Sequence, residues 1–89
     1  MTNAWILRKD DRVYVFKKCI FAEDGRTVEE IEIFDYPTIS SYHEDRWRER
    51  RAGNSLAYAR GVWDELVENG FHRWMRSGFR NPSSRKETA

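Results

Sequence analysis

The first half of the chain has the residue pattern of β-strands. Residues 12–21 are dense in β-branched and aromatic side chains, and residues 27–36 repeat this composition. Between these segments, Glu23-Asp24-Gly25-Arg26 has the composition of a tight turn, because Gly25 can adopt a positive φ. The pattern therefore predicts a β-hairpin that ends before Pro37.

The turn also fixes how the two strands pair. A loop centred on Asp24-Gly25 sets four chemically matched pairs opposite each other: Lys17 with Glu32, Phe16 with Ile33, Val15 with Phe34 and Phe21 with Val28. A shorter strand over residues 4–7 precedes the hairpin and joins it through Lys9-Asp10-Asp11. We therefore expect three antiparallel strands.

The second half of the chain changes to helical spacing. Apolar side chains recur there at intervals of three and four residues: Leu56, Ala59, Trp63, Leu66 and Val67. Asn54 or Ser55 supplies the N-cap. At the other end, Gly70 followed by Phe71 fits a Schellman motif, so the pattern predicts a helix over residues 55–69.

Two interpretations fit the segment between the hairpin and this helix. Ser41 followed by Glu44 has the spacing of a capping box, which predicts a short polar helix that ends near Arg51. Gly53 then separates it from the main helix. Alternatively, this polar helix continues into the next one without a break.

Together these elements predict an α+β domain. Its core is a three-stranded antiparallel sheet packed against one main C-terminal helix, with a short polar helix before it. Residues 72–75 either add a fourth strand or pack irregularly. We place the single domain at residues 1–79, because residues 80–89 have the composition of a disordered tail.

Composition narrows the class of protein further. The 89 residues suffice for one domain, and 15% aromatic residues are too many for a disordered chain. The single cysteine, Cys19, excludes an internal disulfide and suits a reducing compartment. No uncharged stretch is long enough for a transmembrane helix, and charged residues interrupt the N-terminus before a signal peptide develops. We therefore expect a small, soluble, cytoplasmic domain with no membrane association.

The charge distribution is uneven although the total is nearly balanced. Sixteen basic and fifteen acidic residues give a net charge of +1, which does not favour a dedicated polyanion binder. Residues 23–35 contain six acidic residues against Arg26 alone, and both flanking parts are net basic. Either the strands neutralise each other across the hairpin, or the basic C-terminal residues steer an acidic partner.

Few residues are suited to catalysis. Cys19 lies in the middle of an expected strand, where a small buried hydrophobic residue is the usual role. His43 and His72 are far apart in sequence, and neither has a further His or Cys nearby to complete a metal site. The chain has no phosphate-binding Gly-rich loop, nucleophile elbow or dinucleotide motif. We expect no enzymatic activity and no bound metal or cofactor.

Two segments combine tryptophan with arginine. The first contains Arg46, Trp47, Arg48, Arg50 and Arg51, and the second contains Arg73, Trp74 and Arg76. This composition suits a nucleic-acid backbone with a stacked base. Alternatively, both tryptophans pack into the core, the arginines of the first segment pair with Glu44 and Glu49, and Arg73 and Arg76 face water. Because four tryptophans exceed what a thin core needs, we expect at least one to be a partly exposed anchor at a protein interface.

These eight residues lead to two functional hypotheses. The first is a small non-enzymatic protein-interaction or regulatory module with an unidentified protein partner. The alternative is weak, largely sequence-independent nucleic-acid binding through the same Arg/Trp surface. The two differ in geometry, because phosphate binding needs the arginines on one face, away from Glu44, Asp45 and Glu49.

The main helix ends in the pattern Trp-x-x-Leu-x-x-x-Gly-aromatic, formed by Trp63, Leu66, Gly70 and Phe71. With the opening Trp5-Ile6-Leu7 and the basic stretch from Arg46 to Arg51, this chain resembles a family of short uncharacterised cyanobacterial proteins. The resemblance extends over about residues 4–75. It implies a shared fold and a cyanobacterial lineage and carries no mechanism with it.

Overall fold

The computed structural model describes residues 4–74 and has an antiparallel sheet at its centre. Its strands are β1 (Ala4–Lys9), β2 (Arg12–Glu23), β3 (Arg26–Tyr36), β4 (Glu49–Asn54) and β5 (His72–Arg73), and its helices are α1 (Ile39–His43) and α2 (Leu56–Glu68). The strands lie in the order β4-β3-β2-β1-β5, and all neighbours are antiparallel. The expected α+β class is therefore confirmed.

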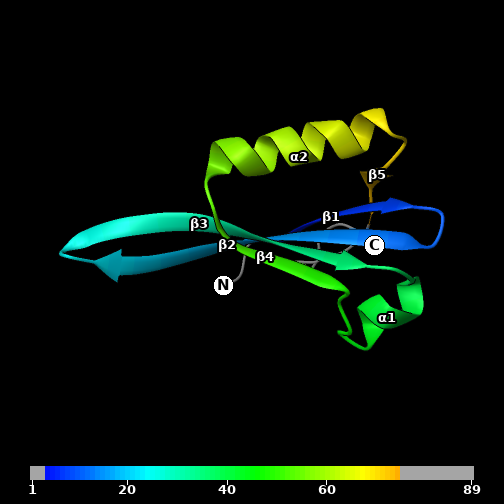
Figure 1. Ribbon diagram of the computed structural model, residues 1–89, viewed down its shortest axis with the longest axis horizontal. Coiled ribbons are helices and arrows are strands. Elements are labelled where there is room, and N and C mark those ends of the chain that lie inside the picture. The colour runs from blue at the N-terminus through cyan, green and yellow to red at the C-terminus, as the bar shows by residue number, and fades with distance from the viewer. Residues whose placement is uncertain (1–3, 75–89) are drawn as a thin grey trace, which may run out of the picture.

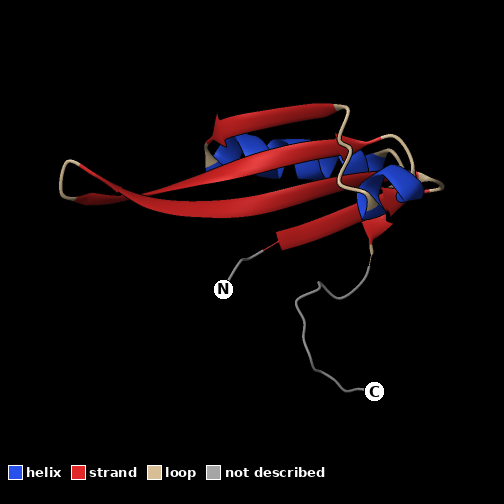
Figure 2. Ribbon diagram, turned by 90° about the horizontal axis from the view of Figure 1, so that it is seen from below, coloured by secondary structure: helices blue, strands red, loops and turns tan. Residues whose placement is uncertain are grey.

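Each face of the sheet carries one helix (Figure 1). We call the face beneath α2 the α2 face, and the opposite face, which α1 covers at one end, the α1 face. Figure 2 views the molecule from the α1 side, with α2 behind the sheet. Because both faces are covered in this way, the sheet forms two hydrophobic clusters instead of one.

The two clusters divide the apolar residues of each strand by their alternation. The buried residues of the α2 face are Leu7, Phe16, Ile31, Ile33, Ala59 and Phe71, and those of the α1 face are Ile6, Val13, Val15, Phe34 and Tyr36. Successive side chains of a strand point to opposite faces, so β3 supplies Ile33 to one cluster and Phe34 to the other. This explains why β3 ends in four consecutive buried residues.

The hairpin predictions are confirmed in detail. All four expected pairs between β2 and β3 are present, and the strands pair as far as Glu23 and Arg26 at the tip. The two turn residues Asp24 and Gly25 have φ of 52° and 75°, as a type I′ turn requires. The preceding β1–β2 turn likewise has Asp10 at φ 54°.

Helix α2 has the expected ends. The Ser55 side chain caps its N-terminus by accepting a 3.1 Å hydrogen bond from the backbone N–H of Tyr58. At the C-terminus, the N–H of Phe71 donates to the carbonyl of Leu66 at 3.0 Å, and Gly70 has φ 99°. With the bond from Gly70 to Val67, this is the Schellman motif that the sequence predicted.

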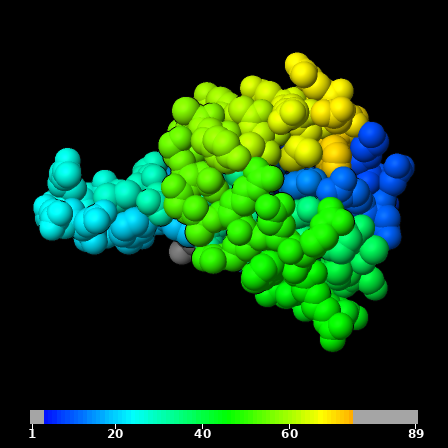
Figure 3. All heavy atoms as spheres, viewed as in Figure 1, coloured from blue at the N-terminus to red at the C-terminus, as the bar shows by residue number. Residues whose placement is uncertain are grey.

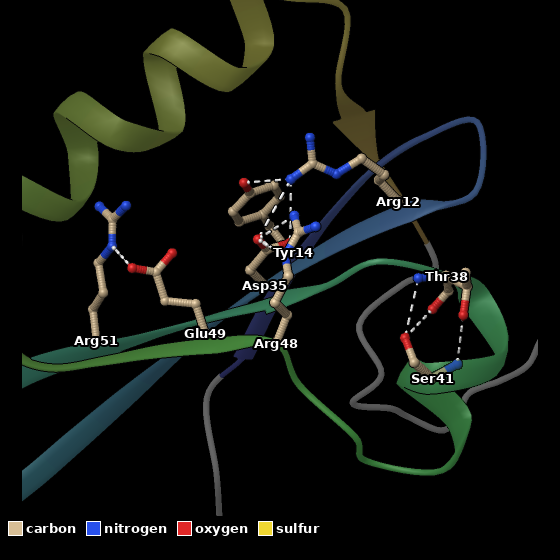
Figure 4. A network of polar contacts seen from close by, with 8 residues as sticks. All are labelled: Arg12, Tyr14, Asp35, Thr38, Ser41, Arg48, Glu49 and Arg51. Carbon is tan, nitrogen blue, oxygen red and sulfur yellow. Dashed lines mark hydrogen bonds and ion pairs between the residues drawn. The ribbon is translucent and has the colours of Figure 1, made fainter.

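The segment before α2 differs from the prediction. In place of a polar helix reaching Arg51, α1 stops at His43 and residues 49–54 form the edge strand β4. The capping box is present one turn earlier than expected, because Thr38 is the N-cap and Ser41 occupies its third helical position (Figure 4).

Within residues 4–74 the sheet therefore has five strands, where the sequence predicted three or four. The edge strand β4 consists of polar residues with Ala52 and Gly53, so it shows no hydrophobic alternation from which a strand could be inferred. Its backbone pairing with β3 gives it its structure. For residues 72–75 the sequence left a strand and irregular packing open, and the structure has a two-residue strand, β5, at His72–Arg73. The domain boundary at residue 79 and the tail 80–89 lie outside the described residues.

The β2–β3 hairpin is longer than its neighbours. The last partner of β2 in β1 is Ala4, opposite Lys17, and β3 meets β4 only from Ile31 onward. Residues 18–30 consequently project as a two-stranded arm beyond the other described residues, as Figures 1 and 3 show. On this arm Ile20 and Phe21 are 57% and 42% exposed.

Two glycines near α2 provide a matched test of these conformations. Gly70→Ala forces a side chain into φ 99° and places its Cβ 3.3 Å from the Lys9 side chain, so we expect the free energy of unfolding to fall by about 1–3 kcal/mol. Gly61→Ala, inside the helix and in open space, should raise it by up to about 1 kcal/mol. Urea denaturation of both variants measures the difference, and equal effects would contradict the assigned helix end.

Candidate interaction surface

The buried carboxylate of Asp35 ties the segment after α1 to the sheet (Figure 4). Its side chain is 7% exposed and accepts hydrogen bonds from Arg48 Nη2 at 2.8 Å and Nε at 3.2 Å. Arg12 Nη2 approaches the same carboxylate at 3.3 Å. The backbone N–H of Arg48 also donates to the carbonyl of Asp35 at 2.7 Å. Side chain and backbone of Arg48 are thus fixed by one residue of β3.

This pairing holds both arginines on the α2 face. The hydrogen bond to Asp35 and the charge of its carboxylate raise the pKa of Arg48. Arg12 Nη2 also donates to the Tyr14 hydroxyl at 2.8 Å and lies over the Tyr14 ring. Because two cations share a single buried carboxylate, the charge of Asp35 is neutralised without a further partner.

The other arginines of the 46–51 segment also have carboxylate partners. Arg46 pairs with Glu44 and Arg51 with Glu49, each at 3.5 Å, and Arg50 pairs with Glu32. Arg51 additionally donates to the Tyr58 hydroxyl of α2 at 2.8 Å, while Arg50 lies over the Phe34 ring of the α1 face. The segment therefore distributes its arginines over both faces of the sheet.

The second predicted segment lies at the opposite edge of the sheet. Arg73 belongs to β5, and β5 and β4 are the two outermost strands. Arg73 pairs with Leu7, so it lies on the α2 face. Arg76 lies outside the described residues. Of the predicted arginines, those that the structure describes do not converge on one surface.

The two predicted tryptophans do share a face. Trp47 packs edge-on against Phe34 with ring centroids 6.2 Å apart, and Trp74 packs against Tyr42 at 5.5 Å. Between them, Phe34 stacks on Tyr36 at 6.3 Å, and Tyr36 meets Tyr42 at 5.5 Å. These five rings form a continuous line across the α1 face, which we call the aromatic row.

Cations border the aromatic row. Lys17 Nζ lies 5.0 Å from the centre of the Phe34 ring, and the Arg8 guanidinium lies 5.2 Å from that of Trp74. Neither Lys17 nor Arg8 has a carboxylate partner among residues 4–74. Trp47 is the most exposed ring of the row, at 45%, whereas Phe34 beneath it is buried.

Sequence reasoning found only the two ends of this row. Phe34 and Tyr36 belong to the hairpin and were expected only as strand residues, and Tyr42 lies on α1. A usable signal was present, because Phe34 and Tyr36 are two residues apart and therefore share a face of the strand. The contribution of α1 could not be inferred, because it depends on how the chain folds back after Pro37.

The tyrosines of the row are held in their neutral form. Tyr36 donates its hydroxyl hydrogen to Asp45 Oδ1 at 2.7 Å, and burial together with this bond raises the pKa of Tyr36 well above its usual range. Burial also raises the pKa of Tyr42. The row therefore stays uncharged except for its bordering cations at neutral pH.

The described residues contain little that is suited to catalysis. Burial and the hydrogen bond from Cys19 Sγ to Glu32 Oε1, at 3.4 Å, raise the pKa of the Cys19 thiol, which disfavours the nucleophilic thiolate. His43 lies against the rings of Tyr42 and Trp74. Within residues 4–74, no three His, Cys, Asp or Glu side chains gather as metal ligands would.

The Asp35 anchor can be tested by removing its charge. Asp35→Asn keeps the volume and weakens the bonds from both guanidinium groups, so we expect the free energy of unfolding to fall by about 1–3 kcal/mol. The control is Glu49→Gln, which breaks an exposed pair and should cost less than about 1 kcal/mol. Urea denaturation measures both, and amide exchange of residues 48–54 should accelerate only in Asp35→Asn.

The raised tyrosine pKa values predict how stability changes in alkali. In the unfolded chain these tyrosines ionise near pH 10, whereas the folded state keeps them protonated, so stability falls as the pH rises above about 10. Tyr36→Phe should make this fall shallower. Denaturation at several pH values checks it, and an absorbance titration of tyrosinate should show one fewer late-ionising group in the variant.

Comparisons with known proteins identify no relative of this chain. No family model, curated protein or solved structure matches the chain. The resemblance to short cyanobacterial proteins accordingly stays a prediction from the sequence. No helix among the described residues is long and apolar enough to cross a membrane. The geometry of the aromatic row is thus the basis on which a function can be proposed.

Proposed function

We propose that this protein is a non-enzymatic interaction module that binds a protein partner through the aromatic row. One observation carries this proposal: the Trp47 ring is 45% exposed although it rests on the buried Phe34. Large aromatic rings that stay in contact with solvent at a defined position are the typical anchors of protein interfaces.

The position of Trp47 is fixed before any partner arrives. Its neighbour Arg48 is bound to Asp35 through both backbone and side chain, and Phe34 is the residue before Asp35 in β3. The anchored backbone of Arg48 and the contact with Phe34 restrict the indole before binding, which lowers the entropy cost of association. Trp74, half-buried at the other end of the row, extends the apolar surface across the same face.

The bordering charges favour a partner segment that is acidic and carries an apolar side chain. Lys17 and Arg8 lie above rings of the row and have no carboxylate partner in the described part of the chain. Acidic groups of a partner would be attracted to these cations, while an apolar side chain would pack beside Trp47.

Nucleic-acid binding is less well supported by the geometry. Arg46, Arg48, Arg50 and Arg51 each have a carboxylate within ion-pair distance and are divided between two faces. A phosphate backbone following one face would reach only some of them and would compete with those carboxylates. Arg73 lies at the far edge of the sheet.

A photocrosslinking residue at position 47 tests the protein-binding proposal. We expect benzoylphenylalanine in place of Trp47 to crosslink to one discrete protein in cells, because position 47 lies within the interface. The control is the same residue in place of Val67, which is similarly exposed at 46% but lies on α2, away from the row. Equal crosslinking from both positions, or none from position 47, would contradict the proposal.

A titration with oligonucleotides separates the two functions. We expect unchanged tryptophan fluorescence when single- or double-stranded oligonucleotides are added at low salt. Binding that weakens steeply with salt and is lost in Arg46→Ala/Arg50→Ala, whose ion pairs do not involve Asp35, would favour the nucleic-acid alternative, because phosphate contacts release counterions.

A further inference from the structure

The outer edge of the arm has no strand beside it in the described part of the chain. β4 pairs with β3 from Ile31 onward, so residues 26–30 of β3 have β2 on one side only. An open edge of this kind presents unpaired backbone N–H and C=O groups that readily pair with another strand. Its sequence is Arg26-Thr27-Val28-Glu29-Glu30.

The side chains of this edge are complementary to themselves. Arg26, Val28 and Glu30 alternate along β3 and therefore share the α1 face. Neither Arg26 nor Glu30 has an ion-pair partner within residues 4–74, whereas Glu29 on the other face pairs with Lys18 at 3.5 Å. An unpaired cation and an unpaired carboxylate thus flank a central valine.

We propose that this edge pairs antiparallel with the same edge of a second copy of the chain. A two-fold axis perpendicular to the sheet through Val28 preserves the two faces, as antiparallel pairing of identical strands requires. Arg26 of each copy then lies opposite Glu30 of the other, and the two Val28 side chains meet at the axis. Opposite charges at directly facing positions stabilise such a pair.

Neighbouring registers are less favourable. Moving the axis to Glu29 sets two like charges opposite each other and directs Thr27 toward Ile31, whose outer side already pairs with Asn54 of β4. Moving it to Thr27 leaves Arg26 opposite Val28 and removes both ion pairs. Among these three registers, the one centred on Val28 is the only one that satisfies the charges.

The apolar residues of the arm fit the same arrangement. Phe21 pairs with Val28 across the hairpin and is 42% exposed. In the proposed dimer, Phe21 and Val28 of one arm continue into Val28 and Phe21 of the other, which forms an apolar strip across four strands on the α1 face. The two arms together make a four-stranded ribbon, whose width is better suited to stability than that of an isolated hairpin.

Sedimentation equilibrium of the full chain tests the dimer. We expect the mass to approach twice 10.7 kDa as the concentration rises. Arg26→Glu and Glu30→Arg each replace two opposite-charge pairs with two like-charge pairs, so either should raise the dissociation constant at least about tenfold. The double variant restores both pairs in reverse and should return the constant to within about threefold of the original.

Matched controls lie on α2. Arg60→Glu and Glu68→Arg change the same charges at exposed helical positions without ion-pair partners in residues 4–74, and they should leave the dissociation constant unchanged. If the mass stays that of a monomer at all concentrations, the proposal is overturned, and any strand that pairs with this edge must have a different sequence. The proposal is also overturned if neither Arg26→Glu nor Glu30→Arg raises the dissociation constant, or if the double variant does not restore it.

A cysteine placed on the axis provides a second readout. In a Cys19→Ser background, Val28→Cys puts two thiols opposite each other, so mild oxidation should give a crosslinked dimer on a non-reducing gel. Thr27→Cys in the same background is the control, because its two copies lie off the axis and face Glu29 instead. Equal crosslinking of the two variants, or none, argues against the register.

Discussion

The ion pair between Asp35 and Arg48 holds the part of the molecule on which the proposed function depends. Burying a carboxylate near the end of a strand, as at Asp35 in β3, lowers stability unless cations and hydrogen-bond donors surround it. Arg12 from β2 and Arg48 from the segment after α1 supply these donors. β4 begins at the residue after Arg48, so the pairing that neutralises Asp35 also places β4 at the edge of β3.

The ion pair between Asp35 and Arg48 also determines on which face of the sheet Trp47 lies. Arg48 is held on the α2 face by Asp35, and Trp47 contacts Phe34 on the α1 face. An arginine-rich segment that by composition could bind polyanions is thereby used largely to attach one edge of the sheet. The neighbouring Trp47 stays exposed, and for this reason we propose a protein partner in preference to a phosphate backbone.

Both faces of the sheet are covered, and this accounts for much of the aromatic content. Trp5 and Trp63 pack on the α2 face, where Phe16 meets Trp63 edge-on at 5.2 Å. Trp47 and Trp74 lie on the α1 face. A sheet with one covered face would leave half of these rings without a surface to pack on. The arm lies beyond both clusters, and its Ile20 and Phe21 side chains stay exposed.

Local signals in the sequence determined the hairpins and the main helix. Asp24-Gly25 set the turn and hence the register of β2 against β3, and Ser55 and Gly70 set the ends of α2, because each acts through neighbouring backbone groups. Only the tertiary structure decided the conformation of residues 44–54. The strand within them, β4, has no apolar alternation. It forms because β3 has an open edge to pair with and because the buried charge of Asp35 binds Arg48, and both β3 and Asp35 are distant in sequence. For the same reason the sequence identified Trp47 and Trp74 as candidate anchors, but only the folded sheet brought them to one face, joined through Phe34, Tyr36 and Tyr42.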